Sequence, residues 1–184
     1  GGAVTSAAEL VVIGKSAGAA LTDETSNTIV GCAAGGTLAG ESNTFMGADA
    51  GRYATSTDHC VAIGRHALRG ASSGTFPTGN NNIAIGNYAG DATTTGDKNI
   101  LVGHQAGTEL LAGGNNVLMG YHSGDSLINA GRNVTMGSYT LQTEDVSTGC
   151  VAIGYAALQD QNVDNANNVA IGHQAALELT TGTD

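Results

Sequence analysis

The sequence predicts an all-β chain that folds as a parallel β-solenoid of about ten coils, each about 17 residues long. A short phrase ending in Gly recurs ten times, and the residues before that Gly alternate as they do in a strand. The intervals between the Gly residues are 16 to 18 residues long, except for one of 22. The segments that join the phrases are rich in Thr, Ser, Asp, Gly and Asn, as expected of turns. The recurring residues are Gly14, Gly31, Gly47, Gly64, Gly86, Gly103, Gly120, Gly137, Gly154 and Gly172.

The three residues before each Gly carry the strand pattern. The residue directly before the Gly is always apolar, and the residue three before it is always Val, Ile or Thr. Such alternation of β-branched and apolar residues is typical of a strand, and we expect these two columns to fill the inside of each coil. The column between them is never charged. We expect it to form an outer face that a second copy covers, with Ala84 and Ala170 in the contact.

Two further columns have a structural explanation. The invariant Gly indicates a positive φ or a backbone contact too close for a Cβ atom. Asn tolerates turns and forms amide ladders when coils stack. Three residues after the Gly every residue is small, which predicts a corner or a second short strand. The Asn column, four residues before the Gly, contains Asn27, Asn43, Asn82, Asn99, Asn116, Asn133 and Asn168.

Composition excludes several classes of partner. The formal charge is -10 and the chain has six Lys and Arg in total, which argues against nucleic acid and against anionic membrane surfaces. No apolar run is long enough for a transmembrane helix, so we expect no membrane insertion. Because the chain opens with Gly, we expect 1–184 to be one repeat domain within a longer or processed chain.

The cysteines and histidines do not form a metal-binding pattern. Cys60 and Cys150 share a column five coils apart, which is roughly 24 Å at about 4.8 Å per coil and too far for a disulfide. Cys32 lies in another column, so we predict three free thiols, which favours assembly in a reducing compartment. His104 and His122 are diagonal neighbours, but no His recurs in one column of adjacent coils. We therefore predict no metal site and no cofactor.

We expect no catalytic residues. The chain has no CxxC, no HExxH, no phosphate-binding loop and no nucleophile elbow. A hexapeptide acyltransferase solenoid needs an apolar residue every six positions, and here the column at that offset is mostly polar. The 22-residue interval adds a turn, and Phe76, Pro77 and Asn80 are the candidate receptor-contact residues. A tolerated insertion is the favoured alternative for that turn.

The repeated phrases resemble a known family. "NNVAIG", "NNIAIG" and "CVAIG" resemble the head repeat of YadA-like trimeric adhesins, and "VAIGYAAL" and "VAIGHQAA" are more similar to repeats of bacteriophage tail fibres. The coils are longer than those of the adhesin heads, and the Ser typical of that repeat is mostly Ala here. Both departures favour the phage side of the resemblance.

The resemblance implies a left-handed β-roll and a homotrimer within a virion tail fibre that projects or supports host-surface attachment. It implies as partners two further copies of the chain, other fibre or tail proteins, and a host receptor or glycan. The alternative is the head of a bacterial trimeric autotransporter adhesin at the cell surface. A solenoid enzyme is a third class.

Overall fold

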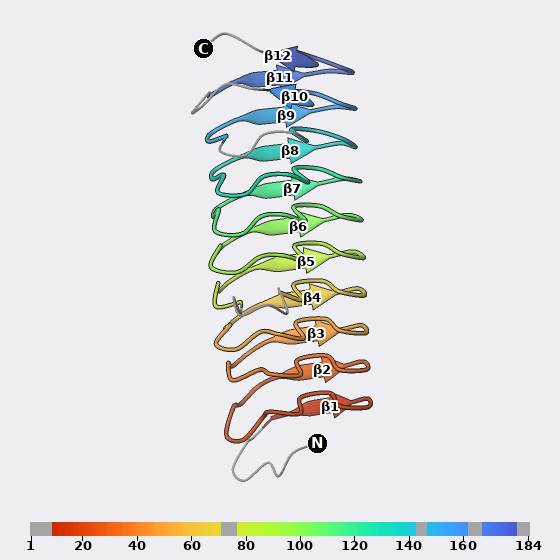
Figure 1. The fold of residues 1–184 in the computed structure, drawn as a ribbon, viewed down its shortest axis with the longest axis vertical. Helices are drawn as coiled ribbons and strands as arrows, with labels where there is room; N and C mark the ends of the chain where they lie inside the picture. Colours follow the sequence, from red (N-terminus) through yellow and green to blue (C-terminus); the bar gives the residue numbers. More distant parts are fainter. Residues whose placement is uncertain (1–8, 71–76, 143–146, 162–166, 180–184) are drawn as a thin grey trace.

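The computed structural model of the chain describes residues 9–70, 77–142, 147–161 and 167–179. Ten three-residue strands stack in chain order in one parallel sheet (Figure 1). Neighbouring strands pair in register, as Val117 does with Val134. The predicted parallel β-solenoid is confirmed, and the ten strands bound nine complete turns. The strands are β1 (Val11–Ile13), β2 (Thr28–Val30), β3 (Thr44–Met46), β4 (Val61–Ile63), β5 (Ile83–Ile85), β6 (Ile100–Val102), β7 (Val117–Met119), β8 (Val134–Met136), β9 (Val151–Ile153) and β11 (Val169–Ile171).

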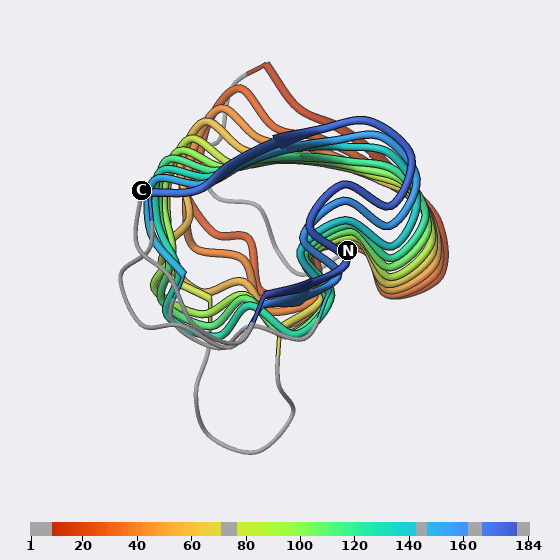
Figure 2. The same cartoon turned by 90° about the horizontal axis from the view of Figure 1, so that it is seen from above.

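The coils superpose closely when seen from above (Figure 2). Each strand runs along one side, after which the chain folds back in a narrow lobe and returns along the opposite side. Two short strands, β10 (Asp160–Gln161) and β12 (Glu178–Leu179), form a separate parallel pair. Nine of the ten small residues three after the Gly are buried in the turn that follows the strand, and Ala175 in the last coil is half-buried. Of the two predicted alternatives, a corner or a second strand, the structure shows the corner.

The predicted assignment of the two strand faces is wrong. The middle residue of each strand points into the coil: Phe45 and Leu118 are buried, and so are Ala84 and Ala170, which were expected at a subunit contact. The flanking residues, expected inside, are exposed or half-buried. The physical reason is that each coil is narrow. The interior of a coil has room for one side chain from the strand, because side chains from the turns fill the rest.

Side-chain sizes inside each coil compensate one another. Where the middle strand residue is large, as at Phe45 or Leu101, the residue four after the repeat Gly is itself Gly. A Cβ at Gly51 would collide with the Phe45 ring. Where the middle residue is small, as at Ala152, the same later position holds a buried Leu158. The interior is therefore filled to similar density by different pairs.

The predicted Asn ladder is confirmed. The Asn99 side chain is typical: its Nδ2 donates to Asn82 Oδ1 at 3.1 Å and to the Gly113 carbonyl at 2.9 Å. Its Oδ1 accepts the backbone N–H of Asn116 at 3.0 Å. The five Asn residues from Asn43 to Asn133 thus bond the coil on either side and also close their own coil. Because these amides are completely buried, every bond replaces one that water would otherwise make.

Cys60, one of the two Cys residues in this column, takes over the same bonds, whereas the Cys150 sulfur contacts the Ser147 hydroxyl and the Gln161 amide. Cys60 Sγ accepts the N–H of Asn82 at 3.4 Å and donates to the Gly79 carbonyl at 3.5 Å. The N–H of Cys60 bonds Asn43 Oδ1, so the ladder continues through the substitution. Cys60 and Cys150 are buried and Cys32 is exposed, and all three are free thiols, as predicted.

The repeat Gly residues have the geometry predicted for them. Gly103 has a φ of +139°, which other residues rarely adopt. A Cβ atom at Gly103 would collide with the backbone carbonyl of Gly120 in the next coil. The same contact recurs from coil to coil, so this column sets how closely the coils approach.

We predict that Asn116→Ala lowers the free energy of unfolding by about 2–5 kcal/mol, because the Ala130 carbonyl and the Asn133 N–H lose their buried partner. Urea denaturation followed by circular dichroism measures the change. Asn129→Ala is the matched control, since Asn129 is exposed, and should change the stability by less than about 0.5 kcal/mol. Equal effects of the two substitutions would contradict the prediction that the Asn ladder stabilises the fold.

We predict that a maleimide reagent labels Cys32 in the folded protein and leaves Cys60 and Cys150 unmodified until the chain is denatured. Burial raises the pKa of the Cys60 thiol to about 11, so near neutral pH it has very little of the reactive thiolate. Peptide mapping by mass spectrometry identifies the labelled residues. Labelling of Cys60 at the rate of Cys32 would refute the ladder geometry around this thiol.

Candidate interaction surfaces

The outer face of the ten-stranded sheet is a continuous apolar surface. It consists of the first and third residue of each of these ten strands: eighteen are apolar, the other two are Thr28 and Thr44, and none is charged. All are at least partly exposed, for example Ile13 at 60% and Ile85 at 38%. We call this surface the apolar face. Large contiguous apolar patches on the surface of soluble proteins mark interaction sites.

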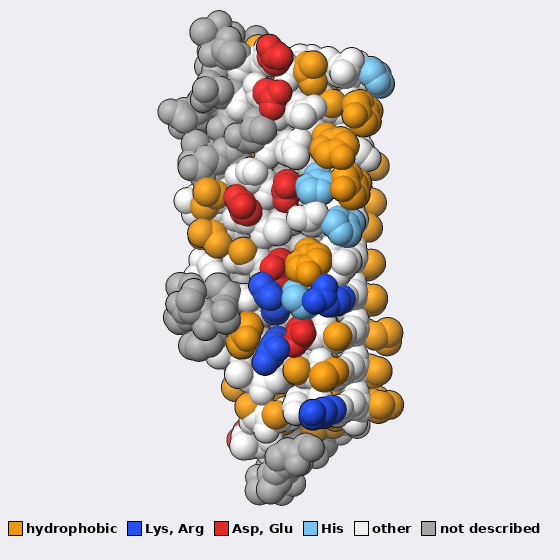
Figure 3. All heavy atoms as spheres, turned by 45° about the vertical axis from the view of Figure 1, so that its right-hand side comes forward, with side chains coloured by type: hydrophobic (Ala, Val, Ile, Leu, Met, Phe, Trp, Pro, Cys, Tyr) orange, Lys and Arg blue, Asp and Glu red, His pale blue; other side chains and the backbone are white. Residues whose placement is uncertain are grey.

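A second surface is a stripe of aromatic rings that follows the lobe beside the apolar face (Figure 3). Consecutive rings lie 4.3 to 6.3 Å apart between centroids, and some are nearly parallel, such as His104 with Tyr121. The stripe holds four of the five His and four of the five Tyr of the chain. We call it the aromatic stripe. Its members are His66, Tyr88, His104, Tyr121, His122, Tyr139, Tyr155 and His173.

Sequence reasoning found the diagonal neighbours His104 and His122, whose ring centroids are 5.9 Å apart, but missed the stripe. Its rings are divided between the first and the second residue after the repeat Gly, so neither column alone is aromatic. The available signal was that each coil from the fourth to the tenth has a ring at one of the two positions.

A cluster of arginines lies at the end of the stripe nearest the N-terminus. Arg65 stacks over Tyr88, with its guanidinium carbon 5.5 Å from the ring centroid, and its Nη1 donates to the Tyr88 hydroxyl at 2.7 Å. Arg52 pairs with Asp49 at 2.7 Å. Arg69 forms a separate ion pair, in which its Nη2 lies 3.0 Å from Asp91 Oδ2. We call Arg52, Arg65 and Arg69 the arginine cluster.

Two ionisable groups respond to this cluster. The pKa of His66 is lowered, first by burial and then by the positive charges of Arg69 and Arg65. Burial raises the pKa of Asp91, although the attraction of Arg69 opposes that rise. His66 Nδ1 and Arg69 Nε are enclosed without a hydrogen-bond partner. The cluster therefore places three guanidinium groups beside an imidazole whose neutral form is favoured.

A surface groove of about 230 Å³ adjoins the arginine cluster across the first three coils. Small residues form most of its walls, including Ala19, Ala33 and Gly36. Arg52 and Tyr53 close one end, with the Arg52 guanidinium carbon 5.2 Å from the centre of the Tyr53 ring. Ser16 and Thr37 add hydroxyl groups to the lining.

The candidate receptor-contact residues lie in or beside the 22-residue interval. Phe76 lies outside the described residues. Pro77 is buried, and its carbonyl accepts the N–H of Thr55 at 3.1 Å. Asn80 is half-buried, and its Oδ1 accepts the N–H of Asp58 at 2.7 Å. Pro77 and Asn80 therefore join this coil to the one before it, and a receptor role for the turn stays a prediction.

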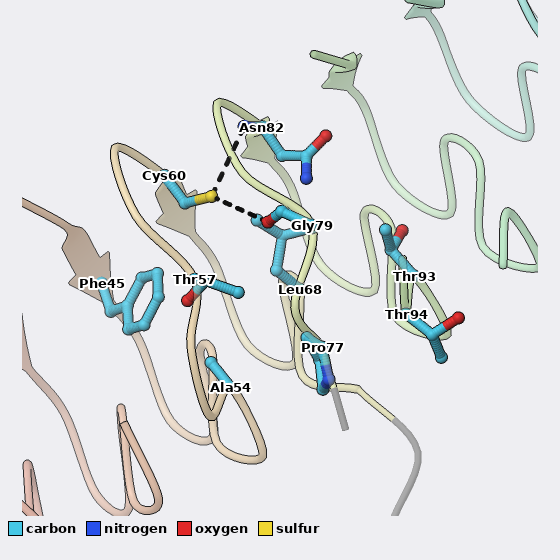
Figure 4. A pocket seen from close by; sticks show the side chains of 10 residues that line it. All are labelled: Phe45, Ala54, Thr57, Cys60, Leu68, Pro77, Gly79, Asn82, Thr93 and Thr94. Carbon is cyan, nitrogen blue, oxygen red and sulfur yellow. Dashed lines mark hydrogen bonds between the residues drawn. The ribbon is translucent and has the colours of Figure 1, made fainter. Parts of the chain in front are cut away.

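An internal cavity lies beside Pro77 and Gly79 (Figure 4). Phe45, Leu68 and Pro77 line it together with Thr57 and Thr93, whose hydroxyl groups have no hydrogen-bond partner. Its volume of about 10 Å³ is at the lower limit for a single water molecule. The cavity is therefore a packing defect of the coil with the insertion and has no room for a larger ligand.

Within the described residues no group of three His, Cys, Asp or Glu side chains is placed to hold a metal ion. The same part of the chain contains no helix that is long and apolar enough to cross a membrane. Comparison of the chain with protein-family models, with curated proteins and with solved structures gives no match.

Proposed function

We propose that the chain is a structural segment of a homotrimeric fibre, most consistent with a phage tail fibre, that projects or supports attachment to a host surface. The observation that carries this proposal is the apolar face, which runs unbroken over all ten strands. A single chain leaves this face in contact with water. Its length and lack of charge favour a permanent partner over a transient one.

A second copy of the same chain is the partner that fits the apolar face. The face repeats once per coil, and another copy has the same repeat at the same spacing, so contacts made by one coil recur at every coil. The twenty side chains match the roughly 20–30 residues that each side contributes to a standard interface. Three copies around one axis is the arrangement implied by the likeness to trimeric adhesin heads and phage fibres.

The free thiols favour the phage fibre over the exported adhesin. Cys60 and Cys150 are buried in hydrogen-bonded positions of the ladder, and Cys32 is exposed. A chain that crosses an oxidising compartment while unfolded exposes all three to wrong disulfides. A chain that folds in a reducing cytoplasm does not. The proposed location is therefore the virion, with the bacterial cell surface as the alternative.

The role that follows is mechanical. Backbone hydrogen bonds join every coil to the next, and the buried Asn ladder runs in the same direction, along the rod. A shaft of this kind resists proteolysis and bending because each coil is held by two neighbours. The turns and the aromatic stripe remain available for contacts with other fibre proteins or with a host receptor.

We predict that the chain has a molar mass in solution of three times 18.2 kDa, measured by light scattering after size exclusion. The double substitution Ile85→Asp with Met119→Asp should give folded monomers, because it places charges on the apolar face while leaving the core unchanged. Circular dichroism verifies that the variant is folded. A stable folded monomer of the unsubstituted chain would overturn the trimer.

Leu111→Asp is the matched control. Leu111 is as exposed as Ile85, at 38%, but lies outside the apolar face, so this variant should remain trimeric. Ala84→Asp should behave differently from both and unfold its coil, because Ala84 is completely buried inside the solenoid. Dissociation by Leu111→Asp, or a folded monomer from Ala84→Asp, would place the contact somewhere other than the apolar face.

A further inference from the structure

The positive charge of this acidic chain is concentrated on one corner. Four of its six Lys and Arg residues, Lys15, Arg52, Arg65 and Arg69, belong to the first four coils, where blue side chains gather in Figure 3. Asp49 and Asp91 are the carboxylates paired with the arginines there. Within the arginine cluster, three guanidinium groups face the two carboxylates that pair with them, although the first four coils also contain Glu9, Asp23, Glu24, Glu41 and Asp58 and the whole chain carries a formal charge of -10.

Arg52 is held in place and still has donors to offer. One of its nitrogens donates to Asp49 Oδ1, and the guanidinium lies over the Tyr53 ring. A guanidinium has five N–H groups in a fixed plane, and the Arg52 side chain is 44% exposed. The remaining N–H groups suit a carboxylate or phosphate, which arginine binds through two parallel hydrogen bonds.

Arg65 and Arg69, in the next coil, add positive charge beside Arg52. Arg65 is exposed and braced by the Tyr88 hydroxyl. The ion pair of Arg69 with Asp91 uses one hydrogen bond, and Arg69 Nε and Asp91 Oδ1 both lack partners. His66, between them in the chain, adds a hydrogen-bonding imidazole, and its pKa is lowered first by burial and then by the charges of Arg69 and Arg65, which favours the neutral form.

The groove beside Arg52 has the lining that one sugar ring requires. Ala19, Ala33 and Gly36 leave room for the ring, and Tyr53 offers an aromatic surface at the charged end. The hydroxyls of Ser16 and Thr37 are able to accept hydrogen bonds from sugar hydroxyls. Its volume of about 230 Å³ is slightly below the roughly 300–1,000 Å³ of ordinary ligand pockets, as suits a single sugar unit.

We propose that this groove binds one acidic unit of a glycan, with the sugar ring over the small residues and its carboxylate or phosphate on Arg52. The inference deepens the proposed function, on which it rests, by naming the class of host ligand. A long polyanion is disfavoured, because the rest of the chain is acidic and repels it beyond the arginine cluster.

Isothermal titration of the intact protein with glucuronic acid, glucose 6-phosphate and glucose tests the inference. We expect at least one of the acidic sugars to bind about tenfold or more tightly than glucose, because a charge-assisted hydrogen bond to Arg52 is lost with the neutral sugar. Comparing the two acidic sugars distinguishes a carboxylated from a phosphorylated source. Failure of both to bind, or equal binding of glucose, overturns the inference.

Substitutions locate the site. Arg52→Gln should weaken binding of the acidic sugar about tenfold, and Arg52→Lys should weaken it less because the charge remains. Arg132→Gln removes an exposed cation far along the rod and should change the affinity less than about twofold. Equal effects of Arg52→Gln and Arg132→Gln would show general electrostatic attraction and overturn the site.

Inorganic phosphate and a blocked groove separate a sugar site from a bare anion site. Ala19→Leu places bulk in the groove and should weaken glucose 6-phosphate binding while leaving inorganic phosphate unaffected. Equal affinity for inorganic phosphate and glucose 6-phosphate in the unsubstituted protein overturns the sugar assignment. Light scattering on the same samples separates the two proposals: trimers that bind no acidic sugar contradict this inference alone, and sugar-binding monomers contradict the trimer alone.

Discussion

Every other feature of this molecule depends on one coil lying in register on the next. Parallel strands must stay at hydrogen-bonding distance over ten layers, so any side chain that separates two coils breaks the sheet above and below it. The repeat Gly meets this constraint by leaving no atom between its Cα and the next carbonyl. The Asn column meets it by bonding both neighbouring coils. Cys60 is tolerated in that column because its sulfur makes the two bonds at the distances the register allows.

The residues of the core vary more from coil to coil than the register does, because side chains of one coil also fill space in the next. A large middle residue such as Leu101 is compensated by Gly107, whereas Ala62 is compensated by Leu68. The fifth coil has small residues at both positions, Ala84 and Gly90, and there Leu68 and Leu101 reach in from the adjacent coils. The small cavity occurs next to this exception. A solenoid therefore accepts variation in its core provided that the sum over neighbouring coils is conserved.

The path of the backbone was predictable from the sequence, but which face of each strand points into the coil was not. The ten Gly residues located every strand of the ten-stranded sheet, though not the short pair β10 and β12, and the Asn column predicted the ladder, because both depend only on position in the repeat. Alternation, however, defines two faces without saying which one is inside, and both faces here are apolar. The compensation between the residue two before the Gly and the residue four after it was the missed signal. Side chains that fill the same space vary together in size, and those on an outer face do not.

The surfaces were harder to predict than the fold for a similar reason. The aromatic stripe is shared between two columns, and the groove beside Arg52 requires small residues in two coils and an arginine in the third. Such features belong to combinations of coils, so no single column of the repeat contains them. The turn with Phe76, Pro77 and Asn80 was easy to find because it interrupts the repeat, but an interruption does not identify a ligand.

The coil with the insertion has a consequence for how such a chain changes over generations. Its strand β4 pairs in register with β5 although the connection between them is five residues longer than the usual one. The unit that must be kept whole is thus the coil, and the connection is where residues are gained. Gain or loss of a complete coil leaves every remaining contact between coils of the same kind. Rod length is then inherited in discrete steps, and it changes without any new interface having to arise.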